Sequence, residues 1–103
     1  MTRKISNLAA NAFYAGRNFK LNNTEVCTYM GGLVQLHLHG HTIAQYNKHN
    51  ARRVMFSLCG WNTTTTRERL RALGIDVHSV KGVPYHEGAA ISSNLYYDSG
   101  INA

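Results

Sequence analysis

This 103-residue chain has few acidic residues. Only five Asp and Glu stand against eleven Lys and Arg, so the formal net charge at pH 7 is +6 with the six histidines neutral. A surplus of that size on a small protein favours acidic partners: nucleic acid first, then an acidic protein surface, then anionic lipid. The carboxylates are scattered singly along the chain, which argues against a catalytic acid/base pair.

Cysteine and long apolar runs are scarce as well. The two cysteines, Cys27 and Cys59, are too few for a disulfide framework and have no metal-ligand spacing. We expect them to be buried small hydrophobic residues of a reduced, cytosolic protein. No apolar run reaches the length of a signal peptide or a membrane span, so we expect no membrane association.

The hydrophobic patterning predicts an α+β fold. Helical spacing marks 5–19, with Gly16 as a stop, and 65–73, which Gly74 ends. Alternation predicts strands at 24–29, 33–46 with a bulge or bend at Gly40, 53–58, 75–80 and, weakly, 85–91. The order α-β-β-β-α-β(β) suits an antiparallel sheet with two helices packed on one face. We expect a single domain over 1–91 and a C-terminal tail over 92–103.

The stretch GWNTTTTRERLRALG at 60–74 sets four threonines before three arginines. Thr65 as N-cap with Glu68 would form a capping box. Arg67 and Arg71 share one helix flank and Arg69 another, so they suit an extended phosphate backbone better than one small anion. Hydroxyls and unpaired N–H groups at a helix start also favour anions. A capped, solvated helix and a phosphate-binding helix both fit this pattern.

Other residues would join such a site if the fold brought them together. A basic turn precedes the 53–58 strand. Trp61, Tyr46 and Tyr85 could stack on single-stranded bases. Trp61 also suits a core position. Phosphate contacts of this kind track the backbone without reading bases. The predicted binding residues are Lys48, Arg52, Arg53, Trp61, Asn62, Thr63, Thr64, Thr66, Arg67, Arg69 and Arg71.

The HLHGH stretch is the one motif that suggests a metal. His37 and His39 are expected to project from the same strand face, and His41 could add a third ligand if Gly40 does not turn the chain away. That strand has no carboxylate, and solvated histidines explain it without a metal. The chain also lacks a nucleophile elbow and a P-loop. We therefore expect no metal, no cofactor and no enzymatic activity.

Four motifs together resemble a known family: NNTEV at 22–26, LHGHTIA at 38–44, GWNTTTTRERLRAL at 60–73 and KGVPYHEG at 81–88. They are similar to the LHGxxIA, GWNTxTTRxRL and KGxxYxxG motifs of a family of small uncharacterised tailed-bacteriophage proteins. The resemblance implies phage origin, expression inside a bacterium and an accessory or host-directed role. It picks out His39, Gly40, Trp61, Asn62, Thr63, Thr65, Thr66, Arg67, Arg69 and Leu70. His37 and His41 fall outside its pattern.

Three functions remain open at this stage. The first is a phage accessory protein of the host cytoplasm that binds nucleic acid non-specifically through a basic face. The alternative is an inhibitor that docks on an acidic host enzyme or defence complex through the same face or through Tyr96 and Tyr97. A virion-associated component is a third class. An exposed edge strand would also permit a homodimer.

Overall fold

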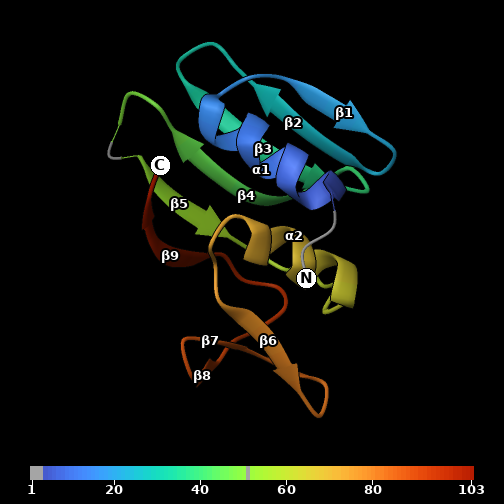
Figure 1. Ribbon diagram of the computed structural model, residues 1–103. Helices are drawn as coiled ribbons and strands as arrows, with labels where there is room; N and C mark the ends of the chain where they lie inside the picture. Colours follow the sequence, from blue (N-terminus) through green and yellow to red (C-terminus); the bar gives the residue numbers. More distant parts are fainter. Residues whose placement is uncertain (1–3, 51) are drawn as a thin grey trace.

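The computed structural model describes residues 4–50 and 52–103 and has the predicted α+β fold: a helix, strands, a second helix and further strands (Figure 1). In chain order the elements are α1 (Lys4–Ala15), β1 (Phe19–Leu21), β2 (Thr24–Thr28), β3 (Leu33–Leu38), β4 (His41–Asn47), β5 (Arg53–Phe56), α2 (Thr64–Ala72), β6 (Val77–Val80), β7 (Val83–His86), β8 (Ala89–Ala90) and β9 (Tyr97–Asn102).

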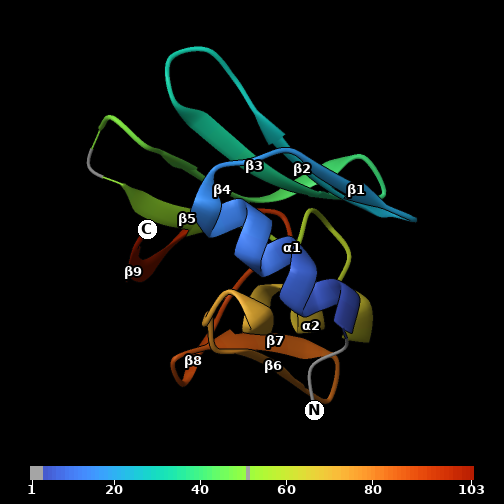
Figure 2. The same cartoon turned by 45° about the horizontal axis from the view of Figure 1, so that its top comes forward.

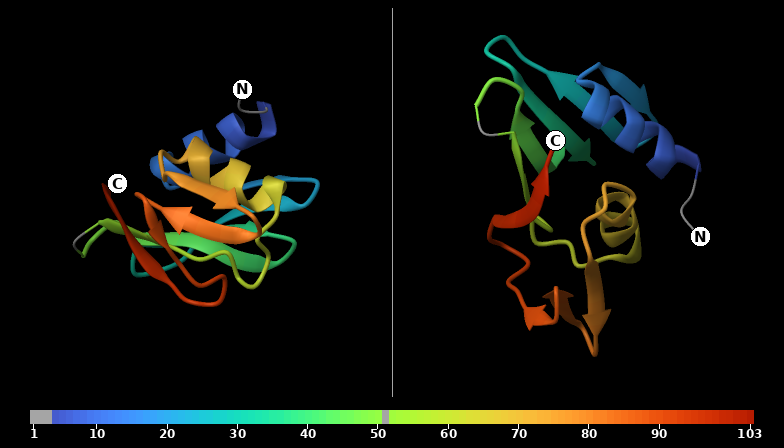
Figure 3. Two further views of the ribbon diagram at one scale, coloured as in Figure 1. Left: turned by 90° about the horizontal axis from the view of Figure 1, so that it is seen from below. Right: turned by 60° about the vertical axis from the view of Figure 1, so that its left-hand side comes forward.

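The strands form two antiparallel sheets. The main sheet has the order β1-β2-β3-β4-β5-β9, and a small sheet has the order β6-β7-β8. Both helices lie on one face of the main sheet, as Figure 3 shows from below. α2 contacts α1 on one side and β6 on the other, so it lies between α1 and the small sheet (Figure 2).

The hydrophobic core lies between the main sheet and the helices. Val34, Leu36 and Leu38 alternate along β3 and are all buried, because successive side chains of a strand point to opposite faces. Phe13 of α1 packs edge-on against Tyr46 with ring centroids 4.9 Å apart. The Tyr46 hydroxyl donates to the Phe13 carbonyl at 2.6 Å, which satisfies the one polar atom of that buried ring.

The structure corrects the prediction of one bent strand over 33–46. β3 and β4 are instead a tight hairpin, and the two residues between them, His39 and Gly40, have φ of 52° and 80°. Positive φ at both central positions is the type I′ pattern that matches the twist of the flanking strands. Asn, Asp or Gly is the usual first residue of such a turn, so His39-Gly40 lacked the sequence signal of a hairpin and suggested a bend.

The predicted C-terminal tail is also wrong, because residues 97–102 form β9, one of the two edge strands of the main sheet. It pairs with β5 through Arg53↔Asn102 and Phe56↔Tyr97. Ser99 is buried, and the Ala103 N–H donates to the carbonyl of Arg52 at 2.7 Å. The domain itself therefore holds its last residues.

Smaller boundary differences follow local geometry. α1 ends at Ala15, before Gly16 at φ 67°, so 17–19 are not helical. Lys81 and Gly82 form the turn between β6 and β7, so Pro84, which lies outside the predicted strands 75–80 and 85–91, is part of β7. Both cysteines, expected to be buried, are half-buried with free thiols.

Candidate nucleic-acid interface

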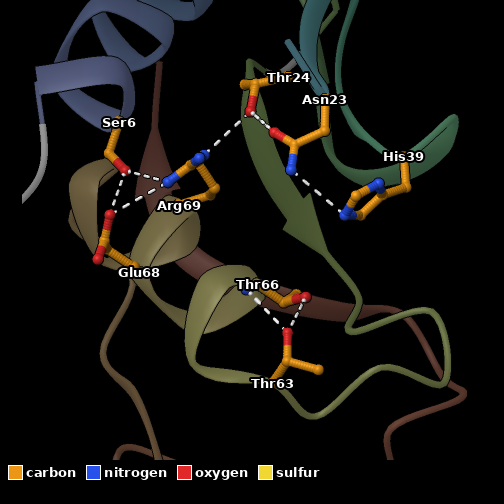
Figure 4. A network of polar contacts seen from close by, with 8 residues as sticks. All are labelled: Ser6, Asn23, Thr24, His39, Thr63, Thr66, Glu68 and Arg69. Atoms are coloured by element: carbon orange, nitrogen blue, oxygen red, sulfur yellow. Dashed lines mark hydrogen bonds and ion pairs between the residues drawn. The ribbon is translucent and has the colours of Figure 1, made fainter.

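The start of α2 is capped by Thr63, not by Thr65. Thr63 has the extended conformation of an N-cap, and its Oγ1 accepts from the Thr66 N–H at 3.2 Å (Figure 4). The capping box predicted from Thr65 and Glu68 is therefore wrong. Four consecutive threonines offer equivalent caps, and the burial of Thr66 selects the register. Because Thr66 is buried, its side chain cannot contact phosphate as predicted.

Arg69 is a structural residue and not the surface cation that its helix position predicted. Its side chain is 3% exposed and donates to Thr24 Oγ1 at 3.0 Å, to Ser6 Oγ at 2.7 Å and to Glu68 Oε1 at 3.1 Å (Figure 4). Ser6 also donates to Glu68 at 2.9 Å. These contacts join α2 to α1 and β2, so Arg69 is not presented to a phosphate in this fold.

The basic turn before β5 is used largely for folding. Arg52 donates through Nε to the Ala103 carbonyl and through a terminal nitrogen to the Lys48 carbonyl, and it lies 5.6 Å from the Tyr46 ring centre. Arg53 forms an ion pair with Asp98 at 3.4 Å. The start of β5 and the start of α2 lie on opposite sides of the molecule in Figure 1 and in the left view of Figure 3. The fold does not unite them in one basic patch.

A smaller group of polar and basic residues does converge at the start of α2. The Asn62 amide donates to Ser79 Oγ and to the Gly82 carbonyl, both at 3.2 Å, which joins the segment to the β6–β7 turn. Arg67 donates to Asn62 Oδ1 at 2.5 Å and to Thr64 Oγ1 at 3.4 Å. Exposed Lys81 precedes Gly82 in that turn. We call Trp61, Asn62, Thr64, Arg67 and Lys81 the Trp61 surface.

Trp61 itself is exposed, which answers the question left open by the sequence. Its side chain is 57% exposed, so it is not a core residue. The other two aromatic residues proposed for base stacking are less suitable. Tyr46 is buried, and the Tyr85 ring already stacks on His78, with centroids 5.7 Å apart and planes 14° from parallel.

A cavity of about 500 Å³ adjoins Trp61, between the β3–β4 turn and the start of α2. Its inner wall is apolar, with Leu38, Ile43 and Leu58 buried beneath it. Its polar residues are His39, His41, and threonines of the first α2 turn, and the His41 and Trp61 ring centres lie 6.4 Å apart.

The three histidines of HLHGH do not converge on a metal. His39 lies in the turn, with Nε2 3.3 Å from the Asn23 amide nitrogen, and together with His41 it lines the cavity. His37 lies between buried Leu36 and Leu38 and therefore points to the opposite face of the sheet. The predicted shared face of His37 and His39 is wrong because β3 ends between them.

Arg71 and Lys81 are two further exposed cations near α2. Arg71 is exposed and donates to the Val77 carbonyl at 3.0 Å, so it joins α2 to β6 beside the Trp61 surface. Lys81 was missed by sequence reasoning. Its place in the KGVPYHEG motif was the available signal, but its proximity to Asn62 depends on the tertiary fold.

Comparison with known proteins identifies the family. The model of the Kyanoviridae Gp96 protein family matches residues 2–98, and the chain therefore belongs to this family of phage proteins. The expectation that the chain belongs to a family of phage proteins is thereby confirmed, and the motifs that suggested it stay a prediction. No curated protein and no solved structure matches the chain. Within 4–50 and 52–103, no helix is long and apolar enough to cross a membrane.

Proposed function

We propose that this phage protein binds single-stranded nucleic acid at the Trp61 surface. One base stacks on the Trp61 indole, and neighbouring phosphates contact Arg67 and Lys81. The observation that carries the proposal is the exposure of Trp61, at 57%, next in the chain to Asn62, whose side chain holds the Arg67 guanidinium. Binding of this kind tolerates any sequence, because every base has a face that can stack.

The backbone around Trp61 is fixed before any ligand arrives. The Trp61 N–H donates to the Leu58 carbonyl at 2.8 Å, and the Trp61 carbonyl accepts from the Thr63 N–H at 2.9 Å. Little backbone entropy is therefore lost when a base stacks on the ring. Stacking contributes about 1–3 kcal/mol per base in proteins of this kind. The adjoining cavity of about 500 Å³ falls within the ~300–1,000 Å³ typical of ligand sites.

The phosphate contacts rest on Arg67 and Lys81, which form no ion pair with a carboxylate within 4–50 and 52–103. The ion pairs among the described residues join Arg53 to Asp98, Arg69 to Glu68 and His78 to Asp76, and none includes Arg67 or Lys81. Two of the five Arg67 N–H donors contact Asn62 and Thr64, which leaves three for a phosphate. The net charge of +6 would raise the association rate with a polyanion.

The test uses Trp61 as its own probe, because it is the only tryptophan of the chain. We expect a short single-stranded oligonucleotide to quench its fluorescence. The affinity should fall as salt rises, with a slope of log K against log salt near −1.4 for two contacted phosphates, at ~0.7 per phosphate. A duplex of equal length should bind more weakly because its bases are already stacked. Absence of quenching, or an affinity indifferent to salt, would rule out this mode of binding.

A second candidate, an inhibitor of a host protein, is favoured by one observation. Leu95 is 57% exposed and Tyr96 is 47% exposed, on the segment whose Ser93 carbonyl accepts from the Gly60 N–H next to Trp61. Exposed apolar side chains beside a basic site suit a protein partner. Nuclease-treated host lysate distinguishes the two: an inhibitor retains one host protein at stoichiometric yield, and Tyr96→Ala weakens that capture without changing oligonucleotide affinity.

A further inference from the structure

We infer that the outer face of β2 and β3 carries a binding site for Zn²⁺ or a similar borderline divalent cation, with Glu25, Cys27 and His37 as its ligands. This site lies apart from the Trp61 surface and does not depend on nucleic-acid binding.

The strand register brings the three side chains together. β2 and β3 are antiparallel, with Glu25 opposite His37 and Cys27 opposite Gln35. Because the intervening Val26 and Leu36 are buried, alternation places all four of these residues on the other face of the sheet. One ligand atom from each of Glu25, Cys27 and His37 lies within 4.8 Å of the other two.

The donor set matches zinc chemistry. A thiolate, an imidazole nitrogen and a carboxylate oxygen are the three protein donors that Zn²⁺ uses, at metal–ligand distances of about 2.0–2.3 Å. Tetrahedral ligands at such distances lie roughly 3–4 Å from one another. Side-chain rotations that move the ligand atoms by about an ångström would therefore complete the site. The thiolate and carboxylate together would balance the charge of the ion. Three protein ligands leave one position for water or another donor.

A hydrogen-bonded pair of glutamines orients the histidine. Gln35 Oε1 accepts from His37 Nε2 at 3.0 Å, and the Gln35 amide donates to Gln45 Oε1 at 3.0 Å. With its proton on Nε2 and donated to Gln35, the His37 ring keeps Nδ1 unprotonated, which is the state in which an imidazole nitrogen binds a metal. Lys20 lies opposite Glu25 on β1, and its positive charge would repel a bound metal ion.

Partial burial distinguishes this cluster from surface acids. All three side chains are half-buried, so water competes less for the ion than at an open surface. Within 4–50 and 52–103, no other three His, Cys, Asp or Glu side chains gather as closely. Cys59, His39 and His41 border the same cavity near Trp61 but do not form such a group, and they therefore supply matched controls.

The test is metal titration of the reduced, chelator-stripped full chain. We expect one Zn²⁺ per chain in competition with a chromophoric chelator, and Co²⁺ in its place should show thiolate-to-cobalt charge-transfer absorption. Cys27→Ser should abolish that absorption, and His37→Gln should weaken binding strongly. Gln35→Ala should weaken it by about 10–100-fold, as expected when a ligand loses its orienting hydrogen bond.

The controls are Cys59→Ser and His39→Gln, which should leave affinity and the cobalt spectrum unchanged. Circular dichroism of each variant checks that it is folded. The inference is overturned if the wild-type chain binds no stoichiometric metal, if the cobalt complex lacks the thiolate band, or if Cys59→Ser removes the band as fully as Cys27→Ser does.

Discussion

At the residue scale, the three arginines of α2 show how position decides role. Arg67 donates to Asn62, which in turn is bonded to the β6–β7 turn. Arg69 is buried against α1 and β2, and Arg71 contacts β6. The sequence predicted that Arg69 lies on a different flank from the other two, but not that this flank is buried. Its acceptors, Ser6 and Thr24, lie far away in the chain, so no local pattern could reveal them.

Arg69→Ala should destabilise the protein strongly. Its removal takes a charged partner from Glu68 and donors from Ser6 and Thr24 inside the structure, and breaking a buried pair in this way costs about 3–5 kcal/mol. Arg71→Ala, at an exposed position, should cost less than about 1 kcal/mol. Urea unfolding of both variants measures the difference, and equal small losses would contradict the structural role of Arg69.

Alanine substitution should affect stability differently at Thr63, the observed N-cap, and at Thr65, the predicted one. Thr63→Ala should reduce the free energy of unfolding by about 1 kcal/mol, because the Thr66 N–H loses its acceptor. Thr65→Ala should have little effect, since its side chain caps no N–H. Thermal and urea unfolding compare the variants. A larger loss of unfolding free energy for Thr65→Ala than for Thr63→Ala would contradict this cap and support the capping box predicted from the sequence.

Tyr14 predicts a change of stability at alkaline pH. Its hydroxyl donates to the Leu73 carbonyl at 2.6 Å, and burial, with a smaller contribution from Tyr46, raises its pKa from 10.0 to about 12. The folded state therefore holds this proton more tightly than the unfolded state. The stabilisation is complete below pH 10 and is lost as the pH rises toward 12. Tyr14→Phe should show a shallower loss across that window in urea unfolding; an identical slope would contradict the assignment.

At the element scale, local signals predicted some elements and missed others. Gly16 and Gly74 ended the helices as expected, and alternation located β2, the buried residues of β3, and β5. β9 was missed because its residues are mostly polar and its partner β5 lies about forty residues earlier. The split between β3 and β4 was missed because His39 occupies a conformation that usually favours Gly or Asn.

Removal of β9 should therefore destabilise the whole domain. A chain ending at residue 95 loses the pairing with β5, the buried Ser99 and the packing of Tyr97 and Ile101 against the core. We expect a loss of about 3 kcal/mol, because the half-buried Tyr97 and Ile101 each contribute part of the ~1.5–3 kcal/mol of a fully buried side chain, and the hydrogen bonds of the strand pair are lost as well. Amides of β5 should also exchange faster with deuterium. An unchanged urea midpoint is the result expected of a dispensable tail.

At the scale of the whole molecule, the fold divides the excess positive charge into separate groups. The turn before β5 uses Arg52 to hold the C-terminus and pairs Arg53 with Asp98, whereas Arg67 and Lys81 remain without carboxylate partners among the described residues. The sequence identified Trp61, Asn62 and Arg67 because they share one motif. It could not identify Lys81, or exclude Arg52, because convergence on one face depends on how distant elements pack.

The most direct measurement compares oligonucleotide affinity of Arg67→Gln with that of Arg53→Gln by Trp61 fluorescence. Each variant removes one positive charge, but only Arg67 belongs to the Trp61 surface. The proposal predicts that Arg67→Gln weakens binding by about tenfold and flattens the salt slope by ~0.7, the share of one phosphate contact on a single strand. Arg53→Gln should bind as the wild type does. Equal losses in the two variants would show that net charge alone attracts the nucleic acid, and the proposed site would be wrong.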